Sequence, residues 1–348
     1  MANPSARAVP KQVAVRDAKI NSCDMGLSRE RFLGNLTTTY GASPANQDRL
    51  MNMSAKVTEG APETVAAPRR ARGALVAIGG AEDKTNEIGI LRTVLALTEK
   101  PDPVVGVVTT ASSIPDDVFA AYDAAFRIIG AADVLDVRVR DRRGANAPQV
   151  IEMIKRVDVL FISGGDQMRL THVFGGSAAL DAIRRRHETG MVIAGTSAGA
   201  ACQSSTMVYG GPADDSLRKG AVKMSAGFGF IDGVIIDTHF LERGRFSRLM
   251  EVGATNPEYL GVGLGEDAAA QFDGGLIRVF GPGHVIVVDS SEISGSNVYD
   301  LAEGEAVAVS GVKMHALVDG YGYSLTDRRV LEPDELEAHG LEPRIANT

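Results

Sequence analysis

The stretch MVIAGTSAGA, residues 191–200, places a glycine-flanked serine between an apolar run and a run of small residues. A short apolar run that ends in glycine is typical of a strand buried in a parallel sheet. Gly195 and Gly199 match the G-x-S-x-G pattern, in which a sharp strand-to-helix turn projects the hydroxyl of the central serine, here Ser197. Backbone N–H groups at the start of the following helix favour an oxyanion. The stretch therefore predicts a parallel α/β sheet with a nucleophilic serine at its edge.

Four more apolar runs precede this stretch, and helical patterns separate them. The runs are ALVAIGG (74–80), PVVGVVTT (103–110), DVLDVRV (133–139) and VDVLFISGG (157–165). Apolar residues at helical spacing predict helices over 88–95, 113–129 and 147–155, and around 180–187. Strands that alternate with helices of this length imply a mostly parallel sheet with helices on both faces.

The pattern becomes richer in strands after about residue 205. The predicted strands there are 233–240, 259–265, 276–281, 284–290 and 307–317. Their hairpin-like spacing predicts an antiparallel C-terminal extension along one edge of the sheet. We expect a flexible or loosely docked N-terminal extension over 1–72, a catalytic α/β domain over 73–330 and a C-terminal tail over 331–348.

Composition narrows the class of protein. The 348 residues are 44% hydrophobic and 23% charged, which excludes a wholly disordered chain. The net charge is −8: residues 1–72 carry 11 Lys/Arg against 6 Asp/Glu, and the remainder carries 25 against 38. An acidic body argues against nucleic acid as a partner.

Location and cofactors are also constrained by the sequence. No apolar stretch approaches the ~20 residues that cross a bilayer, and residues 1–20 lack the apolar core of a signal peptide. Cys23 and Cys202 are too few for a disulfide framework. No His/Cys/Asp cluster has metal-ligand spacing. We expect a cytoplasmic protein with no membrane partner, no metal and no cofactor.

Four polar turns follow predicted strands and should meet at one rim of the sheet. They are GGAED (79–83), TTASS (109–113), SGGDQ (163–167) and GTSAG (195–199). Ligands of open α/β sheets bind at the carboxyl ends of the strands. We expect the site at this rim, with the N–H groups of Ala198 and of the Gly164-Gly165 turn stabilising an oxyanion.

A serine nucleophile needs a base, normally histidine, and a carboxylate that orients it. His187, His284 and His315 lie in predicted helices or strands, where packing explains them, and His172 is a second choice of base. His239 directly follows the predicted strand that contains Asp237 and is the best placed.

Glu266 follows the glycine-rich run GVGLG and is the candidate carboxylate. That run lacks the third glycine of a dinucleotide fingerprint, which argues against an NAD(P)-binding protein. The chain order Ser197, His239, Glu266 also differs from that of the α/β-hydrolases, in which the acid precedes the histidine.

Six motifs in this order resemble cyanophycinases, of the S51 serine peptidases. They are GGAEDK (79–84), TTASSIP (109–115), SGGDQMRL (163–170), GTSAGA (195–200), DTHFLERGRFSRL (237–249) and GVGLGEDAA (261–269). The likeness covers about residues 73–325. It implies a flavodoxin-like fold related to class I glutamine amidotransferases and a homodimer. It also implies hydrolysis of cyanophycin, a polyaspartate with arginine joined to each β-carboxylate, to β-Asp-Arg dipeptides.

The resemblance also implies residue roles. Ser197 matches the nucleophile, His239 the base and Glu266 its carboxylate partner. The implied substrate pocket comprises Gln167, Asp237, Thr238, Arg243, Arg245 and Arg248. A zwitterionic polymer needs both signs in its site, so arginines beside Asp237 fit the chemistry. Thr238 stands where this family usually has glutamine, and Gly265 where an acidic residue is common.

Two alternative functions remain open at the level of sequence. An aspartyl dipeptidase of the same superfamily should carry its acidic residue between the serine and the histidine, whereas Glu266 follows His239. A non-catalytic member that binds arginyl or aspartyl peptides would not need the three candidate catalytic residues. We therefore predict a serine exopeptidase that forms an acyl-enzyme.

Overall fold

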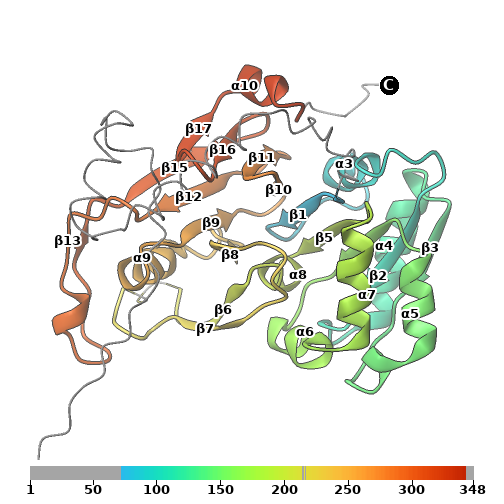
Figure 1. Cartoon of the computed structure of the whole chain (residues 1–348), viewed down its shortest axis with the longest axis horizontal. Coiled ribbons are helices and arrows are strands. Elements are labelled where there is room, and N and C mark those ends of the chain that lie inside the picture. The colour runs from blue at the N-terminus through green and yellow to red at the C-terminus, as the bar shows by residue number, and fades with distance from the viewer. Residues whose placement is uncertain (1–71, 214, 216, 342–348) are drawn as a thin grey trace, which may run out of the picture. The chain divides into compact units, whose positions relative to one another are not determined.

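A computed structural model describes residues 72–213, 215 and 217–341 (Figure 1), so nearly all of the predicted N-terminal extension lies outside the described residues. Five parallel strands form one side of a nine-stranded sheet, as predicted. They are β1 (Leu75–Ile78), β2 (Val104–Val108), β3 (Asp133–Asp136), β4 (Val159–Ile162) and β5 (Val192–Thr196). Their spatial order is β1-β5-β4-β2-β3.

Helices cover both faces of this sheet, which confirms the predicted layers (Figure 1). On one face, α3 (Gly89–Ala96) and α4 (Pro115–Ile128) pack against a cluster that includes Val159 and Phe161. On the other, α5 (Pro148–Lys155) and α7 (Ala178–His187) pack against a cluster that includes Leu160 and Ile162. Successive residues of β4 thus face opposite layers, which is why the strand is apolar throughout.

The order of the strands is that of a doubly wound fold. Read from the edge, β3-β2-β4-β5 has the 2-1-3-4 arrangement of flavodoxin-like sheets, and β1 takes the next place. The direction of winding reverses between β2 and β4. Ligands of such sheets bind in the crevice at this reversal, outside the carboxyl ends of the strands.

The predicted antiparallel extension is present beyond β1. It consists of β10 (Ala269–Asp273), β11 (Leu276–Phe280), β16 (Gly322–Ser324) and β17 (Arg329–Leu331). The last helix, α10 (Pro333–Ala338), follows β17, and Leu331, Leu336 and Leu341 pack with Leu276. Ordered packing therefore continues past the boundary predicted at residue 330.

Other C-terminal strands form a separate sheet, so the prediction that all of them extend one edge was wrong. This sheet contains β15 (Lys313–Leu317), β12 (Val285–Asp289), β9 (Leu260–Leu264) and β8 (Val234–Thr238), in that order. β8 and β9 are parallel, because α9 (Phe246–Thr255) connects them and a parallel pair needs such a crossover. We had not predicted α9.

Smaller elements complete the described fold. They are α6 (Gln167–Phe174), α8 (Ala198–Ala201), the pair β6 (Thr206–Gly210) and β7 (Lys223–Ala226), the pair β13 (Gly295–Ser296) and β14 (Val309–Ser310), and two short 3-10 turns. Within the described ranges, none of the helices has the length and hydrophobicity that a membrane span requires.

Asp289 joins the two large sheets. Its side chain, on β12, is 2% exposed and accepts a hydrogen bond of 3.0 Å from the hydroxyl of Tyr323 on β16. It also accepts one of 3.0 Å from the N–H of Ser291 and pairs with Arg328 at 3.1 Å. Burial raises the pKa of Asp289, but hydrogen bonds from Ser291 and Tyr323 and the charge of Arg328 outweigh burial and lower it overall.

We expect Asp289→Asn to lower the free energy of unfolding by about 2 kcal/mol at pH 7, the usual value of hydrogen bonds to a buried charge. A carboxyl with a lowered folded-state pKa stabilises fully above its unfolded pKa of about 3.9 and loses that contribution as pH falls further. Urea unfolding at pH 7 and below pH 4 should show the difference between wild type and variant shrinking in acid. A pH-independent difference would contradict this role.

Candidate active site

Ser197 occupies a sharp turn between β5 and α8. Its φ of 52° and ψ of −112° lie in a region that is unfavourable for residues other than glycine. The flanking glycines make the turn possible: a Cβ on Gly195 would lie 2.2 Å from the carbonyl oxygen of Gly199, and one on Gly199 would lie 2.1 Å from that of Ile162. The N–H of Ser197 donates to the carbonyl of Ile78 at 3.0 Å. The turn therefore has the sharp strand-to-helix geometry that the sequence predicted.

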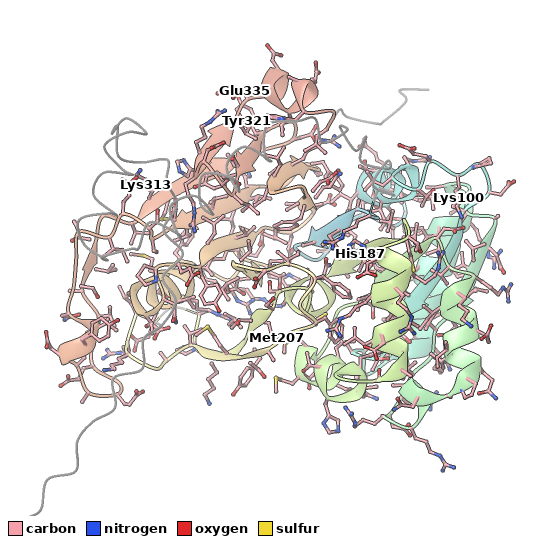
Figure 2. All side chains as sticks on the ribbon, in the orientation of Figure 1. Lys100, His187, Met207, Lys313, Tyr321 and Glu335 are labelled. Atoms are coloured by element: carbon pink, nitrogen blue, oxygen red, sulfur yellow. The ribbon has the colours of Figure 1, made fainter. Side chains whose placement is uncertain are left out.

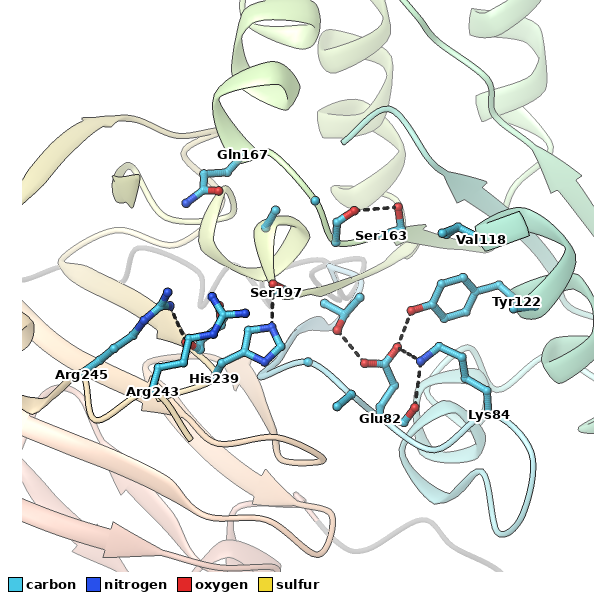
Figure 3. Close-up of a pocket in the computed structure, with 18 residues that line it drawn as sticks. Glu82, Lys84, Val118, Tyr122, Ser163, Gln167, Ser197, His239, Arg243 and Arg245 are labelled. Atoms are coloured by element: carbon cyan, nitrogen blue, oxygen red, sulfur yellow. Dashed lines mark hydrogen bonds and ion pairs between the residues drawn. The ribbon is translucent and has the colours of Figure 1, made fainter. Parts of the chain in front are cut away.

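Three side chains predicted from the sequence form one hydrogen-bonded chain. His239 directly follows β8, and its Nε2 lies 3.0 Å from Oγ of Ser197 (Figure 3). Its Nδ1 lies 2.7 Å from Oε1 of Glu266, which follows β9. The strands end at one edge, so residues 42 and 27 positions apart in the chain meet there. In this arrangement, His239 can take a proton from Ser197 while Glu266 orients the ring.

The backbone of Gly80 packs closely against the imidazole of His239. The φ of Gly80 is +112°, and a Cβ there would lie 2.2 Å from Cε1 of His239. The N–H of His239 also donates to the carbonyl of Gly79 at 2.9 Å. The loop after β1 thus fixes the histidine through both its backbone and its ring.

The predicted oxyanion donors lie next to the serine. A Cβ on Gly164 would lie 3.7 Å from Oγ of Ser197, and Gly165 has a φ of +137°, which favours glycine. Ala198 is the first residue of α8, where N–H groups have no acceptor within the helix. Both glycines and Ala198 line the same pocket as Ser197.

That pocket has a volume of about 500 Å³, and four of the six predicted substrate residues line it. They are Gln167, Thr238, Arg243 and Arg245. Nε2 of Gln167 donates to the carbonyl of Val208 at 3.1 Å, which anchors the amide. Nη1 of Arg245 donates to the carbonyl of Thr238 at 2.6 Å. Figure 3 shows Arg243 and Arg245 on the side of the pocket that carries His239.

Asp237 and Arg248 do not line the pocket, so their predicted substrate contacts require correction. Asp237 precedes Thr238 in β8, and successive strand residues point to opposite faces. Its carboxylate is 3% exposed and pairs with Arg245 at 2.9 Å and with the buried Arg248 at 3.2 Å. Burial raises the pKa of Asp237, and the two guanidinium groups offset part of that rise. Asp237 therefore positions the guanidinium of Arg245 without lining the pocket itself.

Sequence reasoning missed the carboxylate that does line the pocket. Glu82 is 3% exposed, and its Oε2 accepts a hydrogen bond of 2.6 Å from the hydroxyl of Thr196, the residue before Ser197. Its Oε1 accepts a hydrogen bond from Tyr122 of α4 and pairs with Lys84 at 3.1 Å (Figure 3). The motif GGAEDK pointed to this turn, but only the fold brings Thr196 and Tyr122 to it.

The other candidates have structural surroundings. His172 is exposed on α6 and does not line the pocket. His187, labelled in Figure 2, is buried and packs edge-on against Phe230, and its Nδ1 lies 3.3 Å from the carbonyl oxygen of Met191, to which it donates. Burial raises the pKa of the Cys202 thiol, which is consistent with the predicted packing role. Cys23 lies outside the described residues. Throughout the described ranges, no cluster of His, Cys, Asp and Glu has the geometry of a metal site.

Comparison with known proteins decides the family. The sequence model of Peptidase family S51 matches residues 75–280, which include Ser197, His239 and Glu266. The chain belongs to peptidase family S51. As an S51 peptidase it is a serine-type hydrolase. The matched residues include the G-x-S-x-G turn, which carries Ser197.

Relatives of this S51 peptidase include curated cyanophycinases. It is 34% identical over 261 residues to the cyanophycinase of Synechococcus elongatus, covering 74% of this chain and 81% of the relative. It is 34% identical over 266 residues to that of Trichormus variabilis, covering 76% and 89%. Among solved structures, a peptidase from an acI-B1 actinobacterium aligns with a TM-score of 0.56 and 18% identity, covering 74% of this chain and 98% of that chain. This last likeness shows the shared fold.

Because a Cβ on Gly80 would collide with His239, we expect Gly80→Ala to displace the imidazole from Ser197. A displacement of about 1 Å can cost on the order of a hundredfold in rate. Peptidase activity should therefore fall at least a hundredfold, while circular dichroism at 25 °C remains that of the wild type.

Gly89→Ala is the matched control. It makes the same change nine residues away, where an added Cβ would meet no atom within 4 Å. This control should keep wild-type activity. Equal activities of the two variants would show that the loop after β1 does not position the histidine.

Proposed function

We propose that this S51 peptidase is a serine exopeptidase that hydrolyses cyanophycin to β-Asp-Arg dipeptides. The observation that carries the proposal is the hydrogen-bonded chain from Ser197 through His239 to Glu266, beside a pocket that Arg243 and Arg245 line. The curated relatives at 34% identity are cyanophycinases, which supports this choice of substrate.

Each catalytic group has one task in the proposed reaction. Nε2 of His239 accepts the proton of Ser197 as Oγ attacks a main-chain aspartyl carbonyl. N–H groups of Ala198, Gly164 and Gly165 stabilise the oxyanion of the tetrahedral intermediate. His239 then protonates the leaving nitrogen, and an acyl-enzyme remains. A water molecule, deprotonated by His239, hydrolyses this ester, while Glu266 stabilises the imidazolium in both steps.

The proposed substrate recognition uses the arginines of the pocket. Each unit of cyanophycin carries a free carboxylate on its arginine, and guanidinium groups bind carboxylates in a fixed geometry. Asp237 and the carbonyl of Thr238 immobilise Arg245 at 2.9 and 2.6 Å, so little side-chain entropy is lost when a carboxylate binds. Arg243 also lines the pocket, and it forms no ion pair within the described part of the chain.

If Ser197, His239 and Glu266 form a catalytic triad, Ser197→Ala should lower kcat by several orders of magnitude and leave binding of the substrate largely unchanged. Ser225→Ala on β7, outside the pocket, is the matched control and should keep wild-type turnover. Mass spectrometry of products from purified cyanophycin is the readout.

The product distinguishes the alternatives. Release of β-Asp-Arg supports the proposal. Free arginine as the main product would contradict it, and so would cleavage of α-Asp dipeptides with no action on cyanophycin. Binding of cyanophycin without any cleavage would favour the non-catalytic alternative.

Recognition of a carboxylate by Arg243 predicts that Arg243→Gln raises KM for cyanophycin about tenfold, the effect of losing one charge-assisted hydrogen bond. The melting temperature should not change, because Arg243 forms no ion pair with another described residue. Arg156→Gln removes an exposed charge after α5 and serves as the control. An unchanged KM for Arg243→Gln would exclude this contact.

We extend the proposal to a cytoplasmic homodimer. The support for the dimer is the family resemblance, and a chain with only two cysteines suits a reducing compartment. Sedimentation equilibrium of the full chain should give about twice the monomer mass of 36.6 kDa. A monomer at micromolar concentration would contradict the proposed assembly.

A further inference from the structure

A second cavity lies at the carboxyl ends of β2 and β3, and the proposed reaction does not use it. Its volume is about 220 Å³. Thr109, Thr110, Ser112 and Ser113, from the turn after β2, line one side. Pro115, Val139 and three arginines line the rest: Arg138 and Arg140 follow β3, and Arg169 belongs to α6. The cavity therefore combines hydroxyl groups with an excess of positive charge.

This cavity borders the place where the winding of the sheet reverses, between β2 and β4: most of its lining follows β2 and β3, and Arg169 belongs to the helix that follows β4. Crevices at such reversals are the usual ligand sites of doubly wound folds. The nucleophile elbow follows β5, two strands away from β2, and its pocket does not include Arg140 or Arg169. The fold thus provides a second position for a ligand along the same rim.

A thin wall separates this cavity from the active-site pocket. Gly165 lines the active-site pocket, and a Cβ on it would lie 2.2 Å from the carbonyl oxygen of Ala111, the residue before Ser112. That same carbonyl accepts a hydrogen bond of 3.0 Å from the N–H of Asp166. A substrate long enough to pass over this wall can contact both cavities.

The charges of the cavity are only partly compensated. Arg138 pairs with Asp116 at 2.5 Å and with Asp136 at 2.6 Å. Among the described residues, no carboxylate forms an ion pair with Arg140 or Arg169. The guanidinium of Arg169 donates to the carbonyl of Ser112 at 3.4 Å, which directs it toward the cavity.

Asp166, at the start of the helix that carries Arg169, forms no ion pair with Arg140 or Arg169. Asp166 caps α6, where its Oδ1 accepts from the backbone N–H groups of Met168 and Arg169. Two guanidinium groups are therefore available to an anion in the cavity.

We propose that this cavity binds a carboxylate of a cyanophycin unit beyond the two that flank the scissile bond. The inference rests on the proposed function and adds to it a second anchoring point for the polymer. Arg140 and Arg169 bind the carboxylate, and the hydroxyls of Ser112 and Ser113 contact its oxygens, whereas the hydroxyl of Thr110 already donates to the carbonyl of Val139 at 2.5 Å. The site strengthens binding of long chains and leaves the chemical step unchanged.

The test compares two substrates on the full-length enzyme. One is purified cyanophycin, and the other is a two-unit fragment, whose units both flank the scissile bond. Arg140→Gln combined with Arg169→Gln should raise KM for the polymer at least tenfold, with kcat unchanged. KM and kcat for the fragment should stay within twofold of wild type. Each single variant should show part of the effect.

Arg143→Gln is the matched control, since Arg143 is exposed in the same segment but does not line the cavity. Its kinetics should equal those of the wild type on both substrates. An equal rise in KM for the control variant would show that the loss of positive charge, and not the loss of this cavity, weakens binding of the polymer. That result would overturn the proposal. An unchanged KM of the double variant on the polymer would overturn it as well, while normal cleavage by the wild type would leave the proposed function intact.

A small anion is the alternative ligand, and titration calorimetry with inorganic phosphate distinguishes it. Competition by phosphate with the polymer in the wild type, lost in the double variant, supports the proposal. Phosphate binding that the double variant loses, together with an unchanged KM for the polymer, would make the cavity a small-anion site and overturn it. Failure of the wild type to cleave cyanophycin would instead contradict the proposed function.

Discussion

The backbone conformation of Ser197 is the constraint on which the rest of the site depends. A serine with a φ of 52° is unfavourable by roughly 1–3 kcal/mol, so packing around it must impose that geometry. The packing is visible in Gly195 and Gly199, which have no room for a side chain. The N–H of Ser197 is also bonded to the carbonyl of Ile78 in β1. This turn therefore aims the hydroxyl at one point, and the partners of Ser197 had to be placed around that point.

Those partners come from the four-stranded sheet. His239 follows β8 and Glu266 follows β9. These two strands are neighbours and parallel, and α9 forms the crossover that connects them, so both residues lie at the same edge of the sheet. The loop after β1 joins the sheets at the site, since Gly79 and Gly80 contact His239 while Glu82 bonds to Thr196. One short turn thus contacts both His239 and the residue that precedes Ser197.

The sequence predicted what is local and missed what is made by the fold. Ser197, His239 and Glu266 each follow a recognisable apolar strand, and the resemblance to S51 peptidases indicated that they act together, although the sheet that carries His239 and Glu266 was not predicted. The contact of Glu82 with Thr196 spans 114 positions, and no pattern in the sequence marks it. The misassignment of Asp237 was avoidable, because alternation along β8 places it on the face opposite Thr238. The separate sheet was missed because the helix of α9 had not been recognised.

Peptide mapping after reaction with a fluorophosphonate tests the central claim, that the elbow activates Ser197 as a nucleophile, most directly. The probe forms a covalent bond with an activated serine, and mass spectrometry of a digest locates the adduct. The account predicts one adduct per chain, on Ser197, although that residue is only one of many serines. An adduct on a different residue, or undiminished hydrolysis of substrate by protein whose Ser197 carries the adduct, would contradict it.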